Sequence, residues 1–461
     1  MKSAAFLAFM LFLSVVAAPA AEREVTSLAE LAQAAAQDHQ QLRLRPGVYR
    51  MADYLTPEVL AAIREGVDRN HRRPPVPMLV FRGHHNRIDL REVVIEIDTR
   101  LYRLLPQGGY TRCLIVAGSH NHLLGLTIRN TGPEQGSGGN LLSIAGDGTT
   151  IEDVTLHVQG SFPYGYGDLL GKGGPNLVPL QKQSGIQILG SGTRMLRCKV
   201  FSRAFGHCFY IQAGDNIRLE DCYAEGSMRA TTDMLRDTSG PAFKIHFRSV
   251  YANRDGRYLI TPGYMKSLSE DGFRTYGGAG SVTLINCTAV NTRAGFEIGA
   301  RDDAPTKTVI ENCVARGCER AYLIGSHTIV RRSRGDTEHG PLLYLRGGRE
   351  SDVELELTGP GPASLVHVLA TIAGENHRVR LTAAPGTPAG PALPILAGFG
   401  MPAHGEMASA IAPAPTPNLT LITTLASSPV ITSDTLQDAK IETSGATLTD
   451  ASLRASPGSW Q

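Results

Sequence analysis

The stretch GHCFYIQAGDNIRLEDCYAEG, residues 206–226, decides the fold of this chain. Its pattern returns as DGFRTYGGAGSVTLINCTAVN at residues 271–291 and as AGFEIGARDDAPTKTVIENCVARG at residues 294–317. SGIQILGSGTRMLRCKVFS, residues 184–202, is a further copy. Each copy holds a short alternating strand, a turn with Gly, a second strand and a Cys. A repeat of roughly 22–26 residues with two short strands is typical of one coil of a parallel β-solenoid.

Composition agrees with a strand-and-turn repeat. The chain has 461 residues with 50 Gly and a single Trp, and Gly supplies the positive φ angles that repeated turns need. A length of this kind allows one large solenoid or two to three ordinary domains. The formal net charge of +2 favours neither nucleic acid nor an acidic protein as a partner.

The first residues predict export. Lys2 precedes the apolar run AAFLAFMLFLSVVAA, and Ala18-Pro19-Ala20 follows it as a cleavage site. Residues 1–20 are therefore predicted to be a signal peptide, cleaved after Ala20, and we expect a periplasmic or secreted protein. The run is short for a membrane span, and no later segment is apolar enough to form one, so no membrane association is expected after cleavage.

The cysteines predict a ladder and not a disulfide framework. Cys198, Cys222, Cys287 and Cys313 occupy the same position in successive coils, so stacking places them above one another in the interior. A Cys313–Cys318 disulfide stays open as an alternative. The sequence contains no CxxC motif and no metal-ligand spacing.

The presence or absence of the repeat divides the rest of the chain into segments. Residues 21–75 predict an N-terminal cap and a helical insertion, with an amphipathic helix ahead of PGVY and a second helix over residues 55–70, where Thr56 is the N-cap. The β-helix is expected over residues 76–385, a Pro- and Ala-rich linker over 386–417, and weak terminal coils with a tail over 418–461. Two long excursions, at residues 160–183 and 226–270, interrupt the coils and predict functional loops.

Strand alternation predicts which side chains point outward. Phe209, Phe273 and Phe296 suit the core, so Tyr210, Arg274 and Glu297 face out. The outward column is expected to contain, in order, Ile115, Ser143, Gln187, Tyr210, Arg274, Glu297, Leu323 and Leu343. Its middle is polar and its ends are aliphatic. Because the two excursions flank the polar coils, we expect a groove there. The alternative is a surface ion pair of Arg274 with Glu297.

The coil pattern, the helix before PGVY and the ladder of small residues resemble the right-handed parallel β-helix of the pectin-lyase-like superfamily over residues 26–385. The resemblance implies a carbohydrate-active protein with a groove on the outer face of one sheet. Within this superfamily the chain is similar to the chondroitinase B and alginate lyase group, which uses Lys and Arg for catalysis and acidic residues that hold calcium. Calcium is the one cofactor that the resemblance implies. The polygalacturonase pattern is matched only by GHC at residues 206–208, and the DPHD motif of alginate epimerases does not occur.

Elimination from a uronate needs a cation on the carboxylate, a base for the α-proton and an acid for the leaving oxygen. Arg274 suits the first role, Lys266 or His207 the second, and Tyr210 or Tyr276 the third, with Glu297 orienting Arg274. The side chains expected to bind sugar units are Gln187, Gln212, Tyr276, Arg301 and Arg320.

The sequence leaves other functions open. A glycoside hydrolase would use Asp271 and Glu297 as its two carboxylates. A non-catalytic glycan-binding or structural solenoid would need neither. In each case the expected partner is a polysaccharide or oligosaccharide and the expected state is a monomer.

Overall fold

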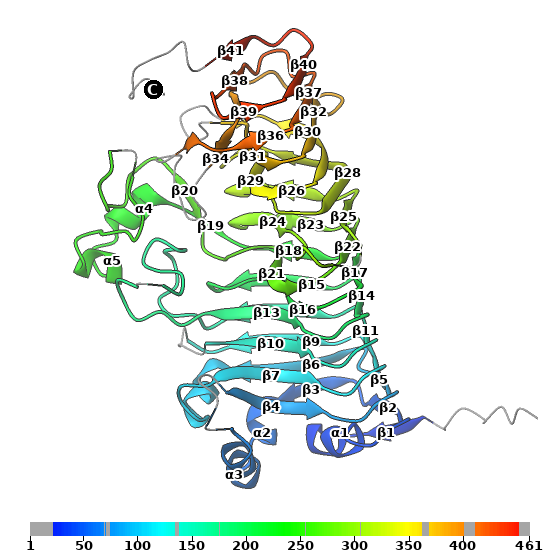
Figure 1. Cartoon of the computed structure of the whole chain (residues 1–461). Helices are drawn as coiled ribbons and strands as arrows, with labels where there is room; N and C mark the ends of the chain where they lie inside the picture. The colour runs from blue at the N-terminus through cyan, green and yellow to red at the C-terminus, as the bar shows by residue number, and fades with distance from the viewer. Residues whose placement is uncertain are drawn as a thin grey trace, which may run out of the picture.

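The computed structural model describes residues 22–450, except 69, 71–73, 134–137, 175, 254, 305, 362–367 and 401–410. The predicted signal peptide and the last residues of the tail lie outside this range. The chain is a right-handed parallel β-helix whose coils stack from β4 upward (Figure 1). One wall is a sheet of 13 strands in the described chain. These are β4 (Pro75–Phe81), β7 (Tyr110–Val116), β10 (Gly139–Ile144), β13 (Gln183–Ile188), β16 (Phe209–Gly214), β21 (Phe273–Ala279), β24 (Ala294–Ile298), β27 (Arg320–Ile324), β29 (Leu343–Arg349), β31 (Ala370–Glu375), β33 (Ile395–Ala397), β38 (Val430–Thr432) and β41 (Leu448–Asp450).

The second wall stacks the strand that follows the first turn of each coil. It contains β2 (Gln41–Leu44), β5 (Arg87–Asp89), β8 (His122–Leu124), β11 (Thr150–Glu152), β14 (Arg194–Leu196), β17 (Ile217–Glu220), β22 (Val282–Ile285), β25 (Thr308–Glu311), β28 (Thr328–Asp336), β30 (Asp352–Gly359), β32 (Arg378–Ala383), β37 (Thr420–Thr423) and β40 (Lys440–Thr443), with β1 (Arg23–Val25) below β2. The third wall contains β3 (Gly47–Arg50), β6 (Val93–Asp98), β9 (Thr127–Thr131), β12 (Thr155–Gln159), β15 (Lys199–Arg203), β18 (Tyr223–Glu225), β23 (Thr288–Val290) and β26 (Val314–Arg316).

The interior consists of like side chains stacked coil on coil. The rings of Phe209, Phe273, Phe296 and Tyr322 lie 4.9–5.1 Å apart and nearly parallel. The cysteine ladder is confirmed, since each of its thiols donates to a carbonyl of the coil below at 3.6–3.8 Å. All seven cysteines are buried and free, so Cys313 and Cys318 are not bonded.

The residue before each ladder cysteine makes the turn between the second and third walls. Asp221, Asn286 and Asn312 adopt φ of 53–54°, the left-handed region that Asn and Asp tolerate better than most residues. Their side chains also stack, since Asn312 donates to Asn286 at 2.7 Å and Asn286 donates to Asp221 at 3.0 Å. The repeated pairs DC and NC in the sequence therefore encode a turn followed by a core thiol.

Helices occur at the N-terminal end of the stack (Figure 1). They are α1 (Leu28–Ala34), α2 (Met51–Tyr54), α3 (Pro57–Glu65) and the 3₁₀ helix η1 (Thr99–Leu104). Leu28, Leu31 and Ala34 of α1 are buried in the same core as the first coils. The predicted N-cap is present, because the Thr56 hydroxyl accepts from the N–H of Val59 at 3.4 Å. Within the described residues no helix is long and apolar enough to cross a membrane.

The segment predicted as a linker carries strands in its described part. β33 extends the 13-stranded wall, pairing with β31 and β38. Short strands β34 (Phe399–Gly400) and β35 (Ala412–Pro413) pair antiparallel, and β36 (Thr416–Pro417) pairs with β39 (Leu436–Gln437). Ile411 beside β35 packs against Leu323 and Tyr344 on the outer face of the wall.

The two excursions fold together into one lobe beside the coil stack (Figure 1). The second excursion begins and ends on the antiparallel strands β19 (Met228–Ala230) and β20 (Met265–Ser267) and carries α4 (Thr231–Arg236) and α5 (Pro241–Lys244). The lobe has its own apolar core, to which the first excursion contributes Tyr166, Leu169 and Leu170 and the second Met234, Ala242, Ile260 and Leu268.

One detail of the predicted coil pattern is wrong. Leu343 does not follow Leu323 in the outward column, since Leu323 is in register with Tyr344 and Leu343 is buried in the core. The coil between β27 and β29 contains a long irregular strand, β28, which shifts its register against β30.

Removing one ring of the internal stack tests the packing of the coils. Phe273→Ala should lower the free energy of unfolding by about 3–5 kcal/mol, because it leaves a cavity between two rings that cannot collapse onto each other. Phe243→Ala, at an exposed position of the lobe, should change it by less than about 0.5 kcal/mol. Urea unfolding followed by circular dichroism measures both, and equal losses in the two variants would contradict the stacked core.

Candidate functional site

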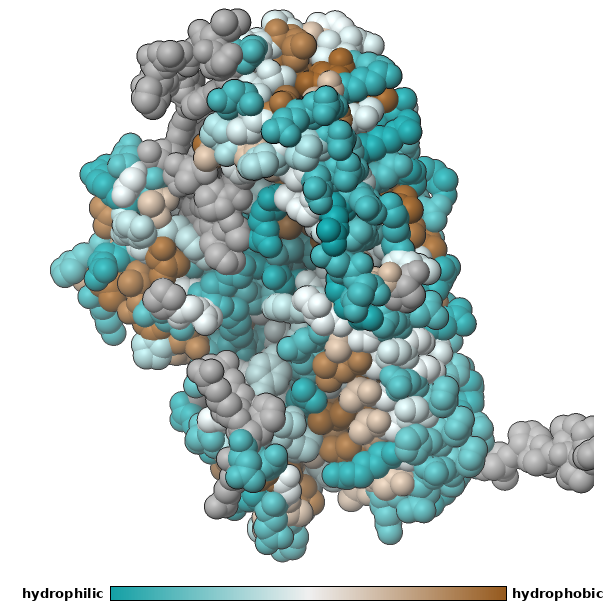
Figure 2. Space-filling model, viewed as in Figure 1, coloured by the Kyte–Doolittle hydropathy of each residue, from teal (hydrophilic) through white to brown (hydrophobic). Residues whose placement is uncertain are grey.

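The outward column is in register through its polar part. Gln187, Tyr210, Arg274 and Glu297 are direct neighbours on β13, β16, β21 and β24. Above them the column becomes apolar, and there Ile411 and the β34–β35 pair cover it. The aliphatic end of the column is thus covered by the chain itself, whereas the polar middle faces the lobe. Figure 2 shows a hollow with a hydrophilic surface between the lobe and the stack.

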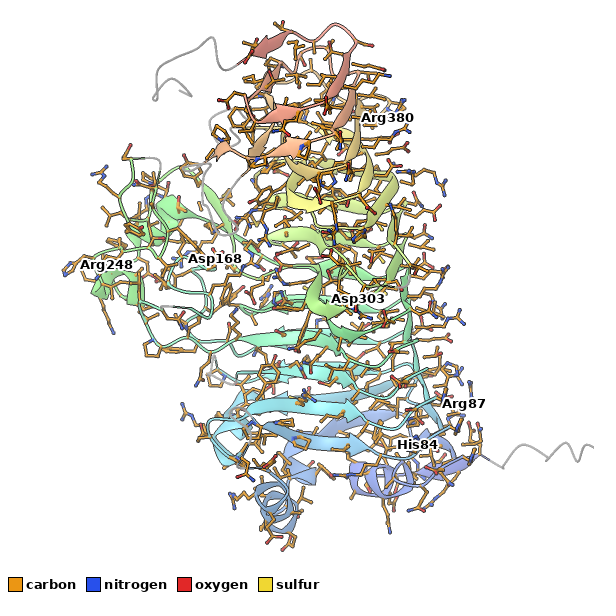
Figure 3. The ribbon with its side chains drawn as sticks, viewed as in Figure 1. His84, Arg87, Asp168, Arg248, Asp303 and Arg380 are labelled. Atoms are coloured by element: carbon orange, nitrogen blue, oxygen red, sulfur yellow. The ribbon has the colours of Figure 1, made fainter. Side chains whose placement is uncertain are left out.

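The turns that precede the wall strands bring a set of charged side chains to the lobe. Each lies just before or within a strand of the 13-stranded wall or in one of the excursions, and Asp168 is seen between the lobe and the coils in Figure 3. We call this set the joint cluster. It consists of Asp168, Lys182, His207, Lys266, Glu270, Asp271, Arg274, Arg293, Glu297 and Glu319.

Arg293 lies at the centre of the joint cluster, although it is only 1% exposed. Its guanidinium donates to both oxygens of Asp271 at 2.8 and 2.9 Å, and lies 3.4 Å from Glu270, 3.5 Å from Asp168 and 3.9 Å from Glu297. Arg293 is not among the residues that the sequence pattern predicts for the site. Its position directly before the core strand AGFEI, where a charged side chain must point toward the lobe, was the available signal.

Arg274, Glu297 and Asp271 form one contact group, and the column predicts the pair Arg274 and Glu297 within it. Arg274 Nη1 donates to Asp271 at 3.0 Å and makes a shorter contact with Glu297. Burial alone would raise the pKa of Asp271, but Arg293, His207 and Arg274 hold it well below the ordinary value. Asp271 is therefore ionised and is paired with the guanidinium groups of Arg274 and Arg293. Arg274 keeps an exposed fraction of 16%, so it still faces the hollow.

His207 and Tyr276 form the second contact group of the site. The Nε2 atom of His207 lies 2.7 Å from the Tyr276 hydroxyl and 3.3 Å from Glu270, and Nδ1 lies 3.2 Å from Asp271. Arg274 is stacked over the ring of Tyr276, with its Cζ 4.6 Å from the ring centroid. Burial and the neighbouring carboxylate of Glu270 raise the pKa of Tyr276, so its hydroxyl keeps its proton. Tyr276 is 37% exposed and is the accessible member of the pair.

Lys266 lies deeper than its predicted role as a base requires. It is 3% exposed, and its ammonium lies 2.9 Å from Asp168 and 2.8 Å from Glu319. Asp168 belongs to the first excursion, Lys266 to the second and Glu319 to the turn before β27. The amine thus joins both parts of the lobe to the stack and is not directed at the hollow.

Lys172 is a second residue that the sequence analysis missed. It lies in the Gly-rich part of the first excursion and is half-buried. Burial lowers its pKa to about 8, and the charge of Arg293 acts in the same direction. The carboxylates of Asp271, Glu270 and Glu297 act in the opposite direction and raise it. Lys172 therefore lies within electrostatic range of the joint cluster and carries a neutral amine from mildly alkaline pH upward.

The remaining predicted residues occupy different surroundings. Tyr210 is buried, with its hydroxyl 2.9 Å from that of Tyr110 and 2.8 Å from Asn140, and burial raises its pKa. Gln187 is also buried and donates to Gln212, which is exposed. These three side chains form a network on the side of the column below Arg274.

Arg301 and Arg320 lie on either side of the expected groove. Arg301 is 2.7 Å from both Asp215 and Asp303, beyond the opposite ends of the strands from Arg293, so the structure does not bring it to the joint cluster. Arg320 is buried at the start of β27, one strand beyond β24.

The carboxylates do not fit a bound calcium ion. Glu270, Asp271 and Glu297 each contact an arginine or lysine, and these cations already neutralise the oxygens that a metal would need. Among the residues that the structure describes, no group of three or more His, Cys, Asp or Glu side chains is arranged to hold a metal.

Replacing the central cation tests the joint cluster. Arg293→Met should lower the free energy of unfolding by about 3–5 kcal/mol at neutral pH, because Asp271 stays buried without its main partner. A carboxylate with a depressed folded pKa stabilises the fold above its unfolded pKa and loses this effect as pH falls. The difference between wild type and variant should therefore shrink below about pH 4.

The control for this measurement is Arg236→Met, which removes an exposed pair with Asp233. It should change the stability by less than about 1 kcal/mol. The midpoints of urea unfolding, measured from pH 3 to 7, test both predictions. An Arg293→Met variant as stable as wild type would show that the fold does not depend on the charge of Arg293.

Comparisons with known proteins give remote likenesses only. No family model and no curated protein matches the chain. Among solved structures it is similar to a rhamnogalacturonan lyase (14% identity, TM-score 0.42, 76% of this chain and 75% of that chain). A mannuronic acid specific polysaccharide family 6 lyase from human gut microbiota has 10% identity and a TM-score of 0.45, covering 93% and 87%. An endo-xylogalacturonan hydrolase from Aspergillus tubingensis has 9% identity and a TM-score of 0.38, covering 94% of both chains. Likenesses at this level say nothing about the reaction of this chain.

Proposed function

We propose that this chain is a polysaccharide lyase that cleaves uronate-containing glycans by β-elimination in the hollow between the lobe and the coil stack. The observation that carries the proposal is the 2.7 Å contact of His207 with Tyr276 beneath a stacked Arg274. It supports the proposal because Tyr276 can act as a proton donor, His207 as its proton-exchange partner and Arg274 as a cation next to both. These are the groups that elimination next to a carboxylate requires.

The reaction is divided among three side chains. Arg274 pairs with the uronate carboxylate, which makes the adjacent C–H bond more acidic. Lys172 takes this proton, because its pKa of about 8 supplies a neutral amine at mildly alkaline pH. The electrons of the C–H bond form the new double bond, and the C–O bond to the leaving sugar breaks. Tyr276 gives its proton to the leaving oxygen, and His207 lies at hydrogen-bond distance to return one.

Glu297 and Asp271 then have positioning roles. Both accept from Arg274 and fix the plane of its guanidinium. The alternative of a hydrolase that uses these two carboxylates is less well supported. A hydrolase needs one protonated carboxylic acid, but the pKa of Asp271 is held far below the range in which it carries a proton, and Glu297 is paired with Arg274 and Arg293. Secretion or export to the periplasm stays part of the proposal, because it would bring the enzyme to a polymeric substrate.

Removing the Tyr276 hydroxyl tests the proton donor. Tyr276→Phe keeps the ring under Arg274 and should lower kcat about 10²–10⁴-fold on the best substrate of a polyuronate panel. The matched control Tyr223→Phe lies on the third wall and should change kcat less than twofold. Ultraviolet absorbance of the unsaturated product measures the rate. New reducing ends without this absorbance would contradict the lyase and favour the hydrolase.

The pH dependence tests the base. Lys172 must be neutral to accept a proton, so kcat/KM should rise as pH increases through about 8 and level off above it. The Lys172→Met variant should lose most of its activity, and its kcat/KM should no longer rise with pH. If kcat/KM of the variant still rises through pH 8 as in the wild type, the base is another group. Thermal unfolding of both proteins checks that the variant is folded.

A further inference from the structure

The outer end of the lobe carries a second surface of unusual composition. Arg248 marks it in Figure 3, at the edge of the lobe that is far from the coil stack. We call it the lobe-tip surface, and it consists of Phe243, Lys244, Arg248, Arg257, Tyr258 and Leu259. All six side chains are exposed, and none takes part in the joint cluster.

The three apolar side chains of this surface are more exposed than Phe, Tyr and Leu usually are in folded proteins. Phe243 is 45% exposed, Tyr258 60% and Leu259 38%. Leaving such rings in water gives up burial free energy of about 25 cal/mol for each Å² of apolar surface. Apolar groups gathered in this way, with polar neighbours around them, mark binding sites more often than scattered surface residues do.

The surface is held in place by the backbone beneath it. Ser249 donates to Tyr258 at 3.1 Å and Ile260 donates to Phe247 at 2.9 Å, so Arg248 faces Leu259 across an antiparallel bridge. The ring of Phe243 packs edge-to-face on Phe247, with centroids 5.9 Å apart. Ala242 and Ile260 anchor both segments in the core of the lobe. The rings therefore need little ordering when a ligand binds.

The charge of the surface is positive. Lys244, Arg248 and Arg257 are accompanied by one acidic neighbour of the described chain, Asp255, which pairs with Arg257 at 2.9 Å. Within the described part of the chain no ion pair involves Lys244 or Arg248, although many other basic residues are paired. Two cations beside two exposed rings complement a ligand that has both carboxylates and flat apolar faces.

We propose that the lobe-tip surface binds a segment of acidic polysaccharide outside the hollow, with sugar rings stacked on Tyr258 and Phe243 and carboxylates paired with Lys244 and Arg248. This inference shares with the proposed function only its ligand class. A protein partner fits less well. Buried aromatic side chains contribute about 150–250 Å² each, and three apolar side chains fall short of the roughly 800 Å² that each partner buries in a stable interface.

Affinity electrophoresis in gels that contain alginate, polygalacturonate or neutral dextran tests this proposal. All proteins carry Arg274→Ala so that the polymers stay intact. Acidic polymers should retard the parent protein and dextran should not. Phe243→Ala with Tyr258→Ala, and separately Lys244→Ala with Arg248→Ala, should weaken binding at least tenfold. The control Val48→Ala removes an exposed apolar group on β3, at the N-terminal end of the coil stack, and should leave binding unchanged.

The outcomes separate this inference from the proposed function. Unsaturated product from the otherwise wild-type protein, together with unchanged retardation of both double variants, would overturn the lobe-tip site alone. Loss of retardation in both double variants without any unsaturated product would overturn the lyase alone. Absence of retardation of the parent protein, or binding to anionic lipid vesicles in place of polysaccharide, would also overturn the inference. Circular dichroism confirms that the variants are folded.

Discussion

A buried guanidinium holds this molecule together where its two parts meet. Arg293 has lost nearly all contact with water, and such a charge is tolerated only when ionised partners surround it. Its partners come from different places in the chain, with Asp271 in the turn before β21 and Asp168 in the first excursion. The electrostatic requirement of one side chain therefore fixes the position of the lobe against the coils. The hollow that we propose as the active site lies between the two parts that this joint connects (Figure 2).

The same cluster explains why the polar groups lie where they do. A β-helix offers an outward column on every coil, and most of this column is covered by the chain or filled with aliphatic groups. Within the described column, ionised side chains replace them at β21 and β24. There, each carboxylate is paired on its buried side, which leaves Arg274 and Tyr276 to face the solvent. The buried carboxylates therefore position the site, whereas Arg274 and Tyr276 are the side chains that can contact a ligand.

Much of this arrangement could be predicted from alternation and repetition alone. Phe209, Phe273 and Phe296 were expected in the core and form its ring stack, and Arg274 and Glu297 were expected side by side and are in contact. Contacts made by the excursions could not be predicted. Lys266 meets Glu319 across 53 residues, and Lys172 reaches the cluster from a Gly-rich loop. Loops have no period, so their partners depend on packing that a linear pattern does not encode. The outward column was predicted to continue with Leu343, but the structure has Tyr344 at that position. The cause is related, because the irregular strand β28 interrupts the period of the repeat.

The division of the lobe between two excursions limits how this protein can evolve. Solenoids commonly gain or lose whole coils, because each coil contacts only its neighbours. Here the strands from β13 to β18 lie between the two halves of the lobe in the chain. Adding or deleting one coil in this interval would move the halves by about 4.8 Å along the axis and separate pairs such as Lys266 and Asp168, which lie 2.9 Å apart. The number of coils between the two excursions therefore cannot change without disrupting the lobe, whereas the number of coils beyond the lobe can vary.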